Sequence, residues 1–514
     1  MRVRVVIASI VAVALAVSGG AWLALRKPHV PEAEDLSAEI VLQYPFAGTL
    51  FPPEIAPPTF RWIDSGGRAD AWRVRIEFQY GADPLEFETA APEWTPSEEE
   101  WEIIKGRSLE RRAQVTVLGV RRARPEAVLS SAQVAIETSR DEVGAPIFYR
   151  DVNLPFFDAI RDPSHICWRF GTVDSTSMPP VVLEEVPVCA NCHSFSADGS
   201  LLGMEVDYGH DKGAYAITPV AEKIFLDNSK IISWGDFRKE DGETTFGLLP
   251  QVSPDGRYVV STVKDRVVFT PTRDLAFSQL FFPIKGILAV YDRREKRFQA
   301  LPGADDPRYV QSNPSWSPDG KEIVFARSEV YPWKGAPNDK KLLRKVIRGF
   351  LEEGETFRFD LYRIPFNEGR GGRAEPLKGA SGDGKSNYFA KYSPDGKWIV
   401  FCKAKSFMLL QPDSELYIIP AQGGEARRLS CNLPTMNSWH SWSPNGKWLA
   451  FSSKTFTPYT QIFLTHISEH GESSPPVVLS RFTASDRAAN IPEFVRVKPG
   501  AIRNIEPVFL DEDP

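Results

Sequence analysis

One short segment of the 514-residue sequence combines residue types and a spacing that could do chemistry, Cys189-Ala190-Asn191-Cys192-His193. A C-x-x-C-H run is the pattern at which haem is attached covalently. The two thiols can form thioethers with the haem vinyl groups, and the adjacent imidazole can bind the iron. The chain has five cysteines and seven histidines, so the match is specific. We therefore predict a covalent haem c held by Cys189, Cys192 and His193.

Two other interpretations of this segment stay open. The two thiolates and His193 could bind another metal together with one further ligand. Alternatively, the cysteines could form a turn without any cofactor, either reduced or joined as a disulfide. Cys402 and Cys431 could also pair outside the cytoplasm, leaving Cys167 single, although sequence does not show whether their Cα atoms come within range. We expect these cysteines to be free buried thiols.

The elements that must position the motif come from a repeat. Five segments end in Ser-Pro-Asp-Gly or a close variant and lead into an apolar strand; they are residues 194–199, 251–256, 315–320, 391–396 and 441–446. The serine and proline fix the entry to a turn, and Asp-Gly or Asn-Gly supplies its positive φ. Successive signatures are 57, 64, 76 and 50 residues apart. This spacing suits four-stranded propeller blades with loop insertions. Apolar residues at helical spacing in 338–353 predict a helix between two blades.

These repeats resemble the TolB-type β-propeller, whose units carry a W/F-S-P-D-G-x-x-I/L-A/V-F pattern. Residues 419–429 also look like the turn between the third and fourth strands of that family. The resemblance implies an all-β propeller with six blades, or alternatively seven. It says little about function, because propellers host binding proteins and enzymes alike.

The two ends of the propeller are expected to close its ring. Residues 490–494 look like the first strand of a blade that lost its Asp-Gly turn, and residues 146–186 would supply the remaining strands. The domain boundaries follow as a β-sandwich at 38–145, a propeller at 146–505 and an acidic tail at 506–514. The sandwich, similar to fibronectin type III or immunoglobulin-like modules, is predicted from alternating strands with turns between them.

The same repeat indicates where a second axial ligand could come from. Counting three residues back from each signature serine gives His193 in one repeat and His440 in another, and this position starts the innermost strand near the channel mouth. His440 is therefore our first candidate to bind the iron, with Met436 as its competitor. Met204 and His210 are weaker candidates. His440 could instead be a polar residue packed beside neighbouring tryptophans, and the remaining histidines, His165, His466 and His470, are expected to be structural or solvated.

The N-terminus predicts the compartment. Residues 1–26 contain an apolar stretch, uncharged from residue 5 to residue 25, which is long enough to span a bilayer as a helix. We predict a single-pass anchor in the bacterial inner membrane, a polar linker at 27–37 and the bulk of the chain in the periplasm. The alternative is a cleaved signal peptide, whose cleavage site would be poor. Covalent haem attachment takes place on that side of the membrane, in agreement with the motif.

Composition excludes several classes of protein. A net charge of −6 without a Lys/Arg run argues against a nucleic-acid partner. The 42 prolines and 36 glycines argue against a long-helix bundle. Residues 379–386 match G-x-x-x-x-G-K-S, but a strand and a hairpin follow instead of a helix, so we expect no nucleotide site. The chain also lacks a G-x-S-x-G nucleophile elbow.

Three functional hypotheses remain. The first is a membrane-anchored haem c propeller that passes electrons to an unknown redox or envelope partner. The second is a cofactor-free propeller that holds protein partners in the envelope, as the TolB resemblance implies. The third is an enzyme at the channel mouth with a haem or metal as the reactive centre, which requires that neither His440 nor Met436 binds the iron.

Overall fold

The computed structural model describes residues 40–186, 192–243, 245–336 and 339–508. Within these residues no helix is long and apolar enough to cross a membrane. The predicted anchor and linker lie outside the described residues, and so does most of the predicted acidic tail. The first residue of that tail, Glu506, belongs to a strand instead, because the preceding Ile505 is buried and extends the pairing. The sheet therefore reaches one residue further than expected.

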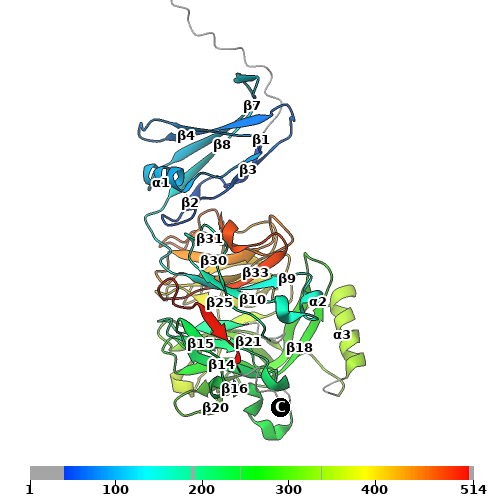
Figure 1. The fold of residues 1–514 in the computed structure, drawn as a ribbon. Coiled ribbons are helices and arrows are strands. Elements are labelled where there is room, and N and C mark those ends of the chain that lie inside the picture. Colours follow the sequence, from blue (N-terminus) through cyan, green and yellow to red (C-terminus); the bar gives the residue numbers. More distant parts are fainter. Residues whose placement is uncertain (1–39, 187–191, 244, 337–338, 509–514) are drawn as a thin grey trace, which may run out of the picture.

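Two sheets form the N-terminal unit (Figure 1). The smaller sheet contains β1 (Ile40–Tyr44), β3 (Phe60–Asp64) and β6 (Glu93–Trp94). The larger contains, in spatial order, β2 (Thr49–Phe51), β8 (Arg124–Thr138), β7 (Ala113–Arg121), β4 (Ala71–Phe78) and β5 (Leu85–Thr89). Buried and less buried residues alternate along β4, as the period of two predicts for a strand with one face on a core.

Helices are few in the described residues. The helix α1 (Glu98–Arg107) begins at a capping box in which Ser97 and Glu100 bond reciprocally to each other's backbone. The other α-helices are α2 (Phe156–Ala159) and α3 (Lys340–Glu352). Short 3₁₀ turns occur at η1 (Pro163–His165), η2 (Tyr208–His210), η3 (Asn228–Lys230), η4 (Trp234–Asp236), η5 (Lys239–Asp241), η6 (Asn367–Gly369) and η7 (Ser480–Phe482). The fold is thus dominated by strands.

The rest of the chain forms four-stranded antiparallel sheets in succession. The first after the closing sheet contains β12 (His193–Phe195), β13 (Leu201–Glu205), β14 (Ala214–Pro219) and β16 (Ile231–Ser233). The next contains β17 (Leu248–Val252), β18 (Tyr258–Pro271), β19 (Gln279–Asp292) and β20 (Arg297–Ala300). It is followed by β21 (Tyr309–Trp316), β22 (Glu322–Glu329), β23 (Asp360–Pro365) and β24 (Glu375–Pro376). A single parallel pair, Gly286 with Val310, links these last two sheets.

Two further sheets and a closing sheet complete the propeller. They are β25 (Ser386–Tyr392), β26 (Trp398–Ala404), β27 (Glu415–Pro420) and β28 (Arg427–Arg428), then β29 (Asn437–Trp442), β30 (Trp448–Ser453), β31 (Gln461–His466) and β32 (Val477–Val478). The closing sheet joins β33 (Arg487–Phe494) to β9 (Ile147–Asn153), β10 (Cys167–Gly171) and β11 (Val181–Leu183). The C-terminal strand β33 therefore pairs with the N-terminal strand β9, which is the closure expected from the sequence. A parallel pair, β15 (Lys223–Phe225) with β34 (Asn504–Glu506), adds a second tie.

Each repeated signature is the turn between the first and second strands of its sheet. In one of them Ser317 donates from Oγ to Asp319 Oδ1 at 2.7 Å, and Asp319 in turn accepts from the amide of Lys321 at 3.1 Å. The amide of Glu322 closes the turn on Ser317 Oγ at 2.9 Å. Gly320 has a φ of 68°, which only glycine adopts without strain. The predicted chemistry of the turn is confirmed.

One prediction about the insertions is wrong. The helix expected between two blades, α3, lies between β22 and β23, which pair with each other in one sheet. The reason is that each signature joins the first strand to the second, so the interval to the next signature holds the rest of the same sheet. In Figure 1 this helix packs at the outer side of the molecule beside β18.

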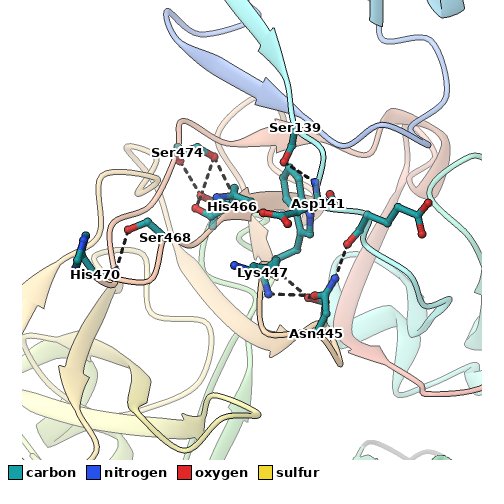
Figure 2. Close-up of polar contacts among 12 residues, drawn as sticks. Ser139, Asp141, Asn445, Lys447, His466, Ser468, His470 and Ser474 are labelled. Carbon is teal, nitrogen blue, oxygen red and sulfur yellow. Dashed lines mark hydrogen bonds and ion pairs between the residues drawn. The ribbon is translucent and has the colours of Figure 1, made fainter. Parts of the chain in front are cut away.

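The sandwich is fixed to the propeller through the sheet of β29–β32. Tyr44 and Phe456 are in ring contact at 6.3 Å, and the Trp448 indole donates to the Asp141 carbonyl at 2.8 Å. Figure 2 shows the polar part of this junction, in which His466 Nε2 lies 2.7 Å from Asp141 Oδ2. The Asn445 amide group donates to the backbone of Glu142 at 2.6 Å. His466 is therefore structural, as expected.

Candidate functional site

The C-x-x-C-H motif enters the propeller at the start of the innermost strand β12. Cys189 lies outside the described residues, whereas Cys192 and His193 are described, and both are buried. The backbone amide of Cys192 donates to Glu205 Oε2 on the neighbouring strand β13 at 3.1 Å. Burial, and next the charge of Glu205, raise the pKa of the Cys192 thiol well above its ordinary value. The thiol is therefore protonated at neutral pH.

A bulge recurs in the innermost strands, four residues before the signature serine. The register of five inner pairs shifts at this point, and the residues there have φ between 50° and 55°; they are Leu249, Asn313, Phe389, Trp439 and Ile491. A bulge presents two consecutive residues on one side of a strand. Cys192 holds the same position relative to its own serine, Ser196, but β12 pairs with β13 in unbroken register at His193. Cys192 and His193 nevertheless both line the cavity on the propeller axis.

This axial cavity is small, with a volume of about 50 Å³. Residues three before the signature serine supply much of its wall, namely His193, Pro314, Ala390, His440 and the equivalent Pro492. The alignment of the repeats therefore placed His193 and His440 correctly in one cavity. Charged and amide side chains complete the wall, with Lys391 Nζ donating to Gln251 Oε1 at 2.9 Å.

The His193 imidazole is buried and neutral, and its ring nitrogens make few contacts. His193 is 1% exposed, and the centre of its ring lies 4.8 Å from the centre of the Phe148 ring, edge to face. Neither ring nitrogen makes a hydrogen bond of ordinary geometry to the described residues, although the carbonyls of Ile491 and Phe148 lie close enough to act on the ring. Burial lowers the pKa of His193 to about 3. A neutral imidazole with an unpaired nitrogen is the form that binds a metal.

The His440 imidazole, by contrast, is already engaged. Its Nε2 lies 2.9 Å from the carbonyl oxygen of Val400, so this nitrogen carries the proton and donates. The other nitrogen, Nδ1, lies 3.8 Å from the Cys402 thiol, whose one proton also has the Asn437 carbonyl and Ser438 Oγ within reach. Burial lowers the pKa of His440 to about 3, so the ring is neutral at physiological pH. Both nitrogens thus serve the packing of β29 against β26.

The other predicted ligands lie elsewhere. Met436 is fully buried in a core cluster and lines neither the axial cavity nor the larger cavity described next. Met204 is the cross-strand partner of His193 and packs in a different core cluster. The side chain of His210 lies outside the described part of the structure. The sequence-based pairing of His193 with Met436 is therefore not supported by their positions.

A larger cavity of about 420 Å³ adjoins the axial one. Cys192, Leu249, Trp439 and Ile491 line both cavities, so the bulges form the boundary between them. Most of the remaining wall is apolar and comes from three segments; it consists of Val152, Leu154, Phe156 and Ile160, of Val267, Phe269 and Phe281, and of Leu409 and Leu410. Long strands β18 and β19 extend past their sheet as a hairpin to supply the second group.

Two ionisable side chains flank Cys192 and face the larger cavity. When the second strands of the six sheets are aligned by their pairing with the innermost strands, Glu205 and Arg150 fall at the same position. The other four sheets have smaller side chains there, namely Thr262, Ala326, Cys402 and Ser452. Glu205 accepts from the amides of Cys192 at 3.1 Å and of Leu249 at 3.2 Å, and burial raises its pKa to about 8. The Arg150 guanidinium lies 5.8 Å from the Trp168 ring.

Sequence reasoning missed Glu205, Arg150 and Lys212, which also lines this cavity and pairs with Asp207. The signal was present in the repeat, because two long ionisable residues replace small ones at a single repeat position. The apolar wall could not be found this way, because the hairpin and the segment 409–410 are insertions outside the repeat.

The other cysteines and the glycine-rich loop line neither cavity. No group of three or more His, Cys, Asp or Glu that could hold a metal ion occurs among the described residues. Cys167, Cys402 and Cys431 are free and buried, as expected, and burial raises the pKa of Cys402 and Cys431 to about 12. Residues 379–386 lead directly into strand β25, so no helix follows this glycine-rich loop.

The sheet topology defines the chain as a β-propeller protein. No family model and no curated protein matches its sequence. Solved structures similar to it include TolB from Acinetobacter baumannii, at 13% identity and a TM-score of 0.41, over 75% of this chain and 79% of that chain. Periplasmic gluconolactonase from Pseudomonas aeruginosa gives 12% and 0.37, over 68% and 100%. Hydrazine synthase from Kuenenia stuttgartiensis gives 15% and 0.32, over 58% and 70%. Function is therefore argued below from the residues of this chain.

Proposed function

We propose that this chain is an extracytoplasmic β-propeller that carries a covalently attached haem c and passes electrons. The observation that carries the proposal is that Cys192 lies at the boundary of two cavities and the next residue, His193, lines the axial one. Cys192 lines an apolar space of about 420 Å³, and His193 has a buried neutral ring whose nitrogens make no hydrogen bond of ordinary geometry to the described residues. A buried polar group without a partner has a cost in stability that a bound ligand would remove.

The motif names the residues that would hold the group it implies. Cys189 and Cys192 would form the two thioethers, and His193 would bind the iron. The apolar side chains of the larger cavity would exclude water from the macrocycle, while Arg150 and Lys212 would hold its carboxylates. When bound, the haem supplies a one-electron redox centre. Glu205 would fix the motif by accepting from the amide of Cys192.

We further infer the context of this site. The sheets make up six blades, with the closing blade built from both ends of the domain. The N-terminal apolar stretch anchors the chain in the inner membrane and leaves the propeller in the periplasm. The sandwich, docked against the sheet of β29–β32, serves as a spacer between the anchor and the propeller.

Attachment of the haem is tested by mass and colour. The full chain, expressed together with haem-maturation machinery, is expected to gain the mass of one haem and to give a pyridine haemochrome spectrum. Cys192→Ser is expected to lose the second thioether and shift this spectrum. Cys402→Ser is the matched control, because Cys402 is equally buried but lines neither cavity. A wild-type chain of unmodified mass would refute the proposal and leave the cofactor-free envelope interaction propeller.

A further inference from the structure

The first described residue, Ile40, lies at the end of the sandwich that faces away from the propeller. Ile40 begins β1, whereas Tyr44 at the other end of this strand is in ring contact with Phe456 of the propeller. Ile40 pairs with Asp64 of β3, and Asp64 Oδ2 accepts from Ser130 Oγ at 2.8 Å. Ser130 belongs to the part of β8 that pairs with the end of β7. The chain therefore enters the sandwich beside the tip of the β7–β8 hairpin, at the far end of the sandwich in Figure 1.

Exposed arginines gather at this hairpin tip; they are Arg68, Arg121, Arg122 and Arg124. The Nε of Arg121 donates to the carbonyl of Arg68 at 3.1 Å, which joins the hairpin to the loop after β3. The same two segments carry the carboxylates Asp70 and Glu126, and Asp70 Oδ1 accepts from the backbone amide of Arg122 at 2.7 Å. None of the four guanidinium groups forms an ion pair with the described residues. This group, named the arginine tip below, is therefore positive in a chain of net charge −6.

Exposed apolar side chains lie close to the arginine tip. Val41 and Ile63 pair across β1 and β3 next to Ile40, and each is about half exposed. Val128 of β8, which pairs with Val120 near the end of β7, is exposed as well. Apolar side chains beside cations are typical of a surface that rests in the headgroup region of a bilayer. This combination, at the end where the chain enters, favours a membrane over an acidic protein as the partner.

We propose that the arginine tip binds the anionic lipid headgroups of the membrane in which the chain is anchored. The inference rests on the anchor of the proposed function and is independent of the haem. Residues 26–39 lie between the uncharged stretch and Ile40, and a segment of that length extends at most about 50 Å, which keeps the arginine tip close to the bilayer. The planar guanidinium group suits the oxygens of a lipid phosphate. Each arginine close to an anionic surface should favour the contact about fivefold.

Arginine labelling of the anchored full chain tests this contact. The chain is assembled into nanodiscs of phosphatidylcholine with or without phosphatidylglycerol, treated with phenylglyoxal at low salt, and analysed by peptide mass spectrometry. We expect phosphatidylglycerol to slow labelling of the arginine tip by about fivefold or more. Arg111 and Arg112 are the internal control, because they are exposed and precede β7 at its opposite end, about 30 Å away. Their labelling should not depend on the lipid.

Two double variants separate the arginine tip from charge in general. Arg121→Gln combined with Arg122→Gln should weaken the contact about 25-fold and so expose Arg68 and Arg124 to labelling in both kinds of disc. Arg111→Gln combined with Arg112→Gln removes the same charge from the other end of β7 and should leave the protection unchanged. All four substituted side chains are exposed, so both variants keep the fold.

The results that would overturn the inference differ from failure of the proposed function. Equal labelling of the arginine tip in both kinds of disc would overturn it and leave an acidic protein as the partner. Protection that persists in the Arg121→Gln, Arg122→Gln variant would overturn it too. In high salt the anchored chain should stay in the disc and lose only the protection of the arginine tip, because salt screens exposed charges. A chain that leaves the disc in high salt would refute the anchor, and a colourless chain would refute only the haem.

Discussion

The buried neutral state of His440 makes the stability of the protein depend on pH in a way that one substitution isolates. In the folded chain the pKa of His440 is lowered to about 3 from an ordinary value of 6.5, because burial disfavours the charged ring. Between pH 3 and pH 6.5, His440 is therefore protonated in the unfolded chain but neutral in the folded chain. His440 contributes its full stability above pH 6.5 and loses it progressively as the pH falls toward 3.

The magnitude follows from the distance between the working pH and the unfolded pKa. At pH 5, which is 1.5 units below the pKa of the unfolded ring, protonation stabilises the unfolded chain by about 2 kcal/mol. At pH 7 this loss of stability is close to zero. His440→Gln removes the titration but also the bond to the Val400 carbonyl, so it should destabilise the chain by about 1–3 kcal/mol at pH 7. The difference between wild type and variant should then shrink by about 2 kcal/mol at pH 5.

Urea unfolding of the haem-free full chain at pH 7 and pH 5 measures this difference. Other titrating groups, including Glu205, act equally on both proteins and cancel in the comparison. Ser438→Ala is the matched control, because Ser438 is a fully buried neighbour in the same strand without a titrating group, and its effect should not change with pH. A His440→Gln effect that stays constant or grows at pH 5 would refute the neutral buried ring, and with it the argument that Val400 and Cys402 hold it.

Four further expectations concern other parts of the fold. A double-mutant cycle of Asp141→Ala and His466→Ala should give a coupling of about 1–3 kcal/mol in urea unfolding, and additivity would refute the junction contact. Lys454→Met should speed amide exchange at the β18–β19 tip, and unchanged exchange would show that the tip holds without it. Asp319→Ala should cost about 1–2 kcal/mol in thermal unfolding; a neutral effect would contradict the turn chemistry. Because burial raises the pKa of Glu205 from 4.5 to about 8, stability should fall as pH rises from 4.5 to 8 and level off above 8, and Glu205→Gln should abolish this fall; a variant that still shows it would exclude Glu205 as its source.

The fold was predictable from the sequence because its turn chemistry is local. Asp319 and Gly320 specify a hairpin through contacts within six residues, and the same pattern recurs along the chain. The closing pair of β33 with β9 was also predictable, because residues 490–494 keep the alternation of an inner strand. The helix α3 was expected between two blades but lies within one, between β22 and β23. The turn pattern shows where a pair of strands begins, but it does not show where the sheet ends.

The candidate site was predictable only in part, for a physical reason. The residue types and spacing of the C-x-x-C-H motif identify Cys192 and His193 as candidates. The alignment of the repeats places His440 at the equivalent position, and the structure shows that it lines the same cavity as His193. The engagement of His440 by Cys402 could not be read from sequence, because it depends on how two sheets pack. The apolar cavity depends on a hairpin that crosses to Lys454, a contact spanning about 180 residues that no local pattern encodes.

The innermost strands share a repeat position that faces two cavities at once. Leu249, Trp439 and Ile491 lie at bulges four residues before the signature serine or its equivalent, and each lines both cavities. In a regular strand successive side chains point to opposite faces, whereas a bulge brings two consecutive residues to one side, as at Trp439–His440 and Ile491–Pro492. Cys192 and His193 line the axial cavity from the same position, although β12 pairs with β13 in unbroken register at His193. The repeat position, rather than a register shift of β12 itself, therefore accounts for where these two residues lie.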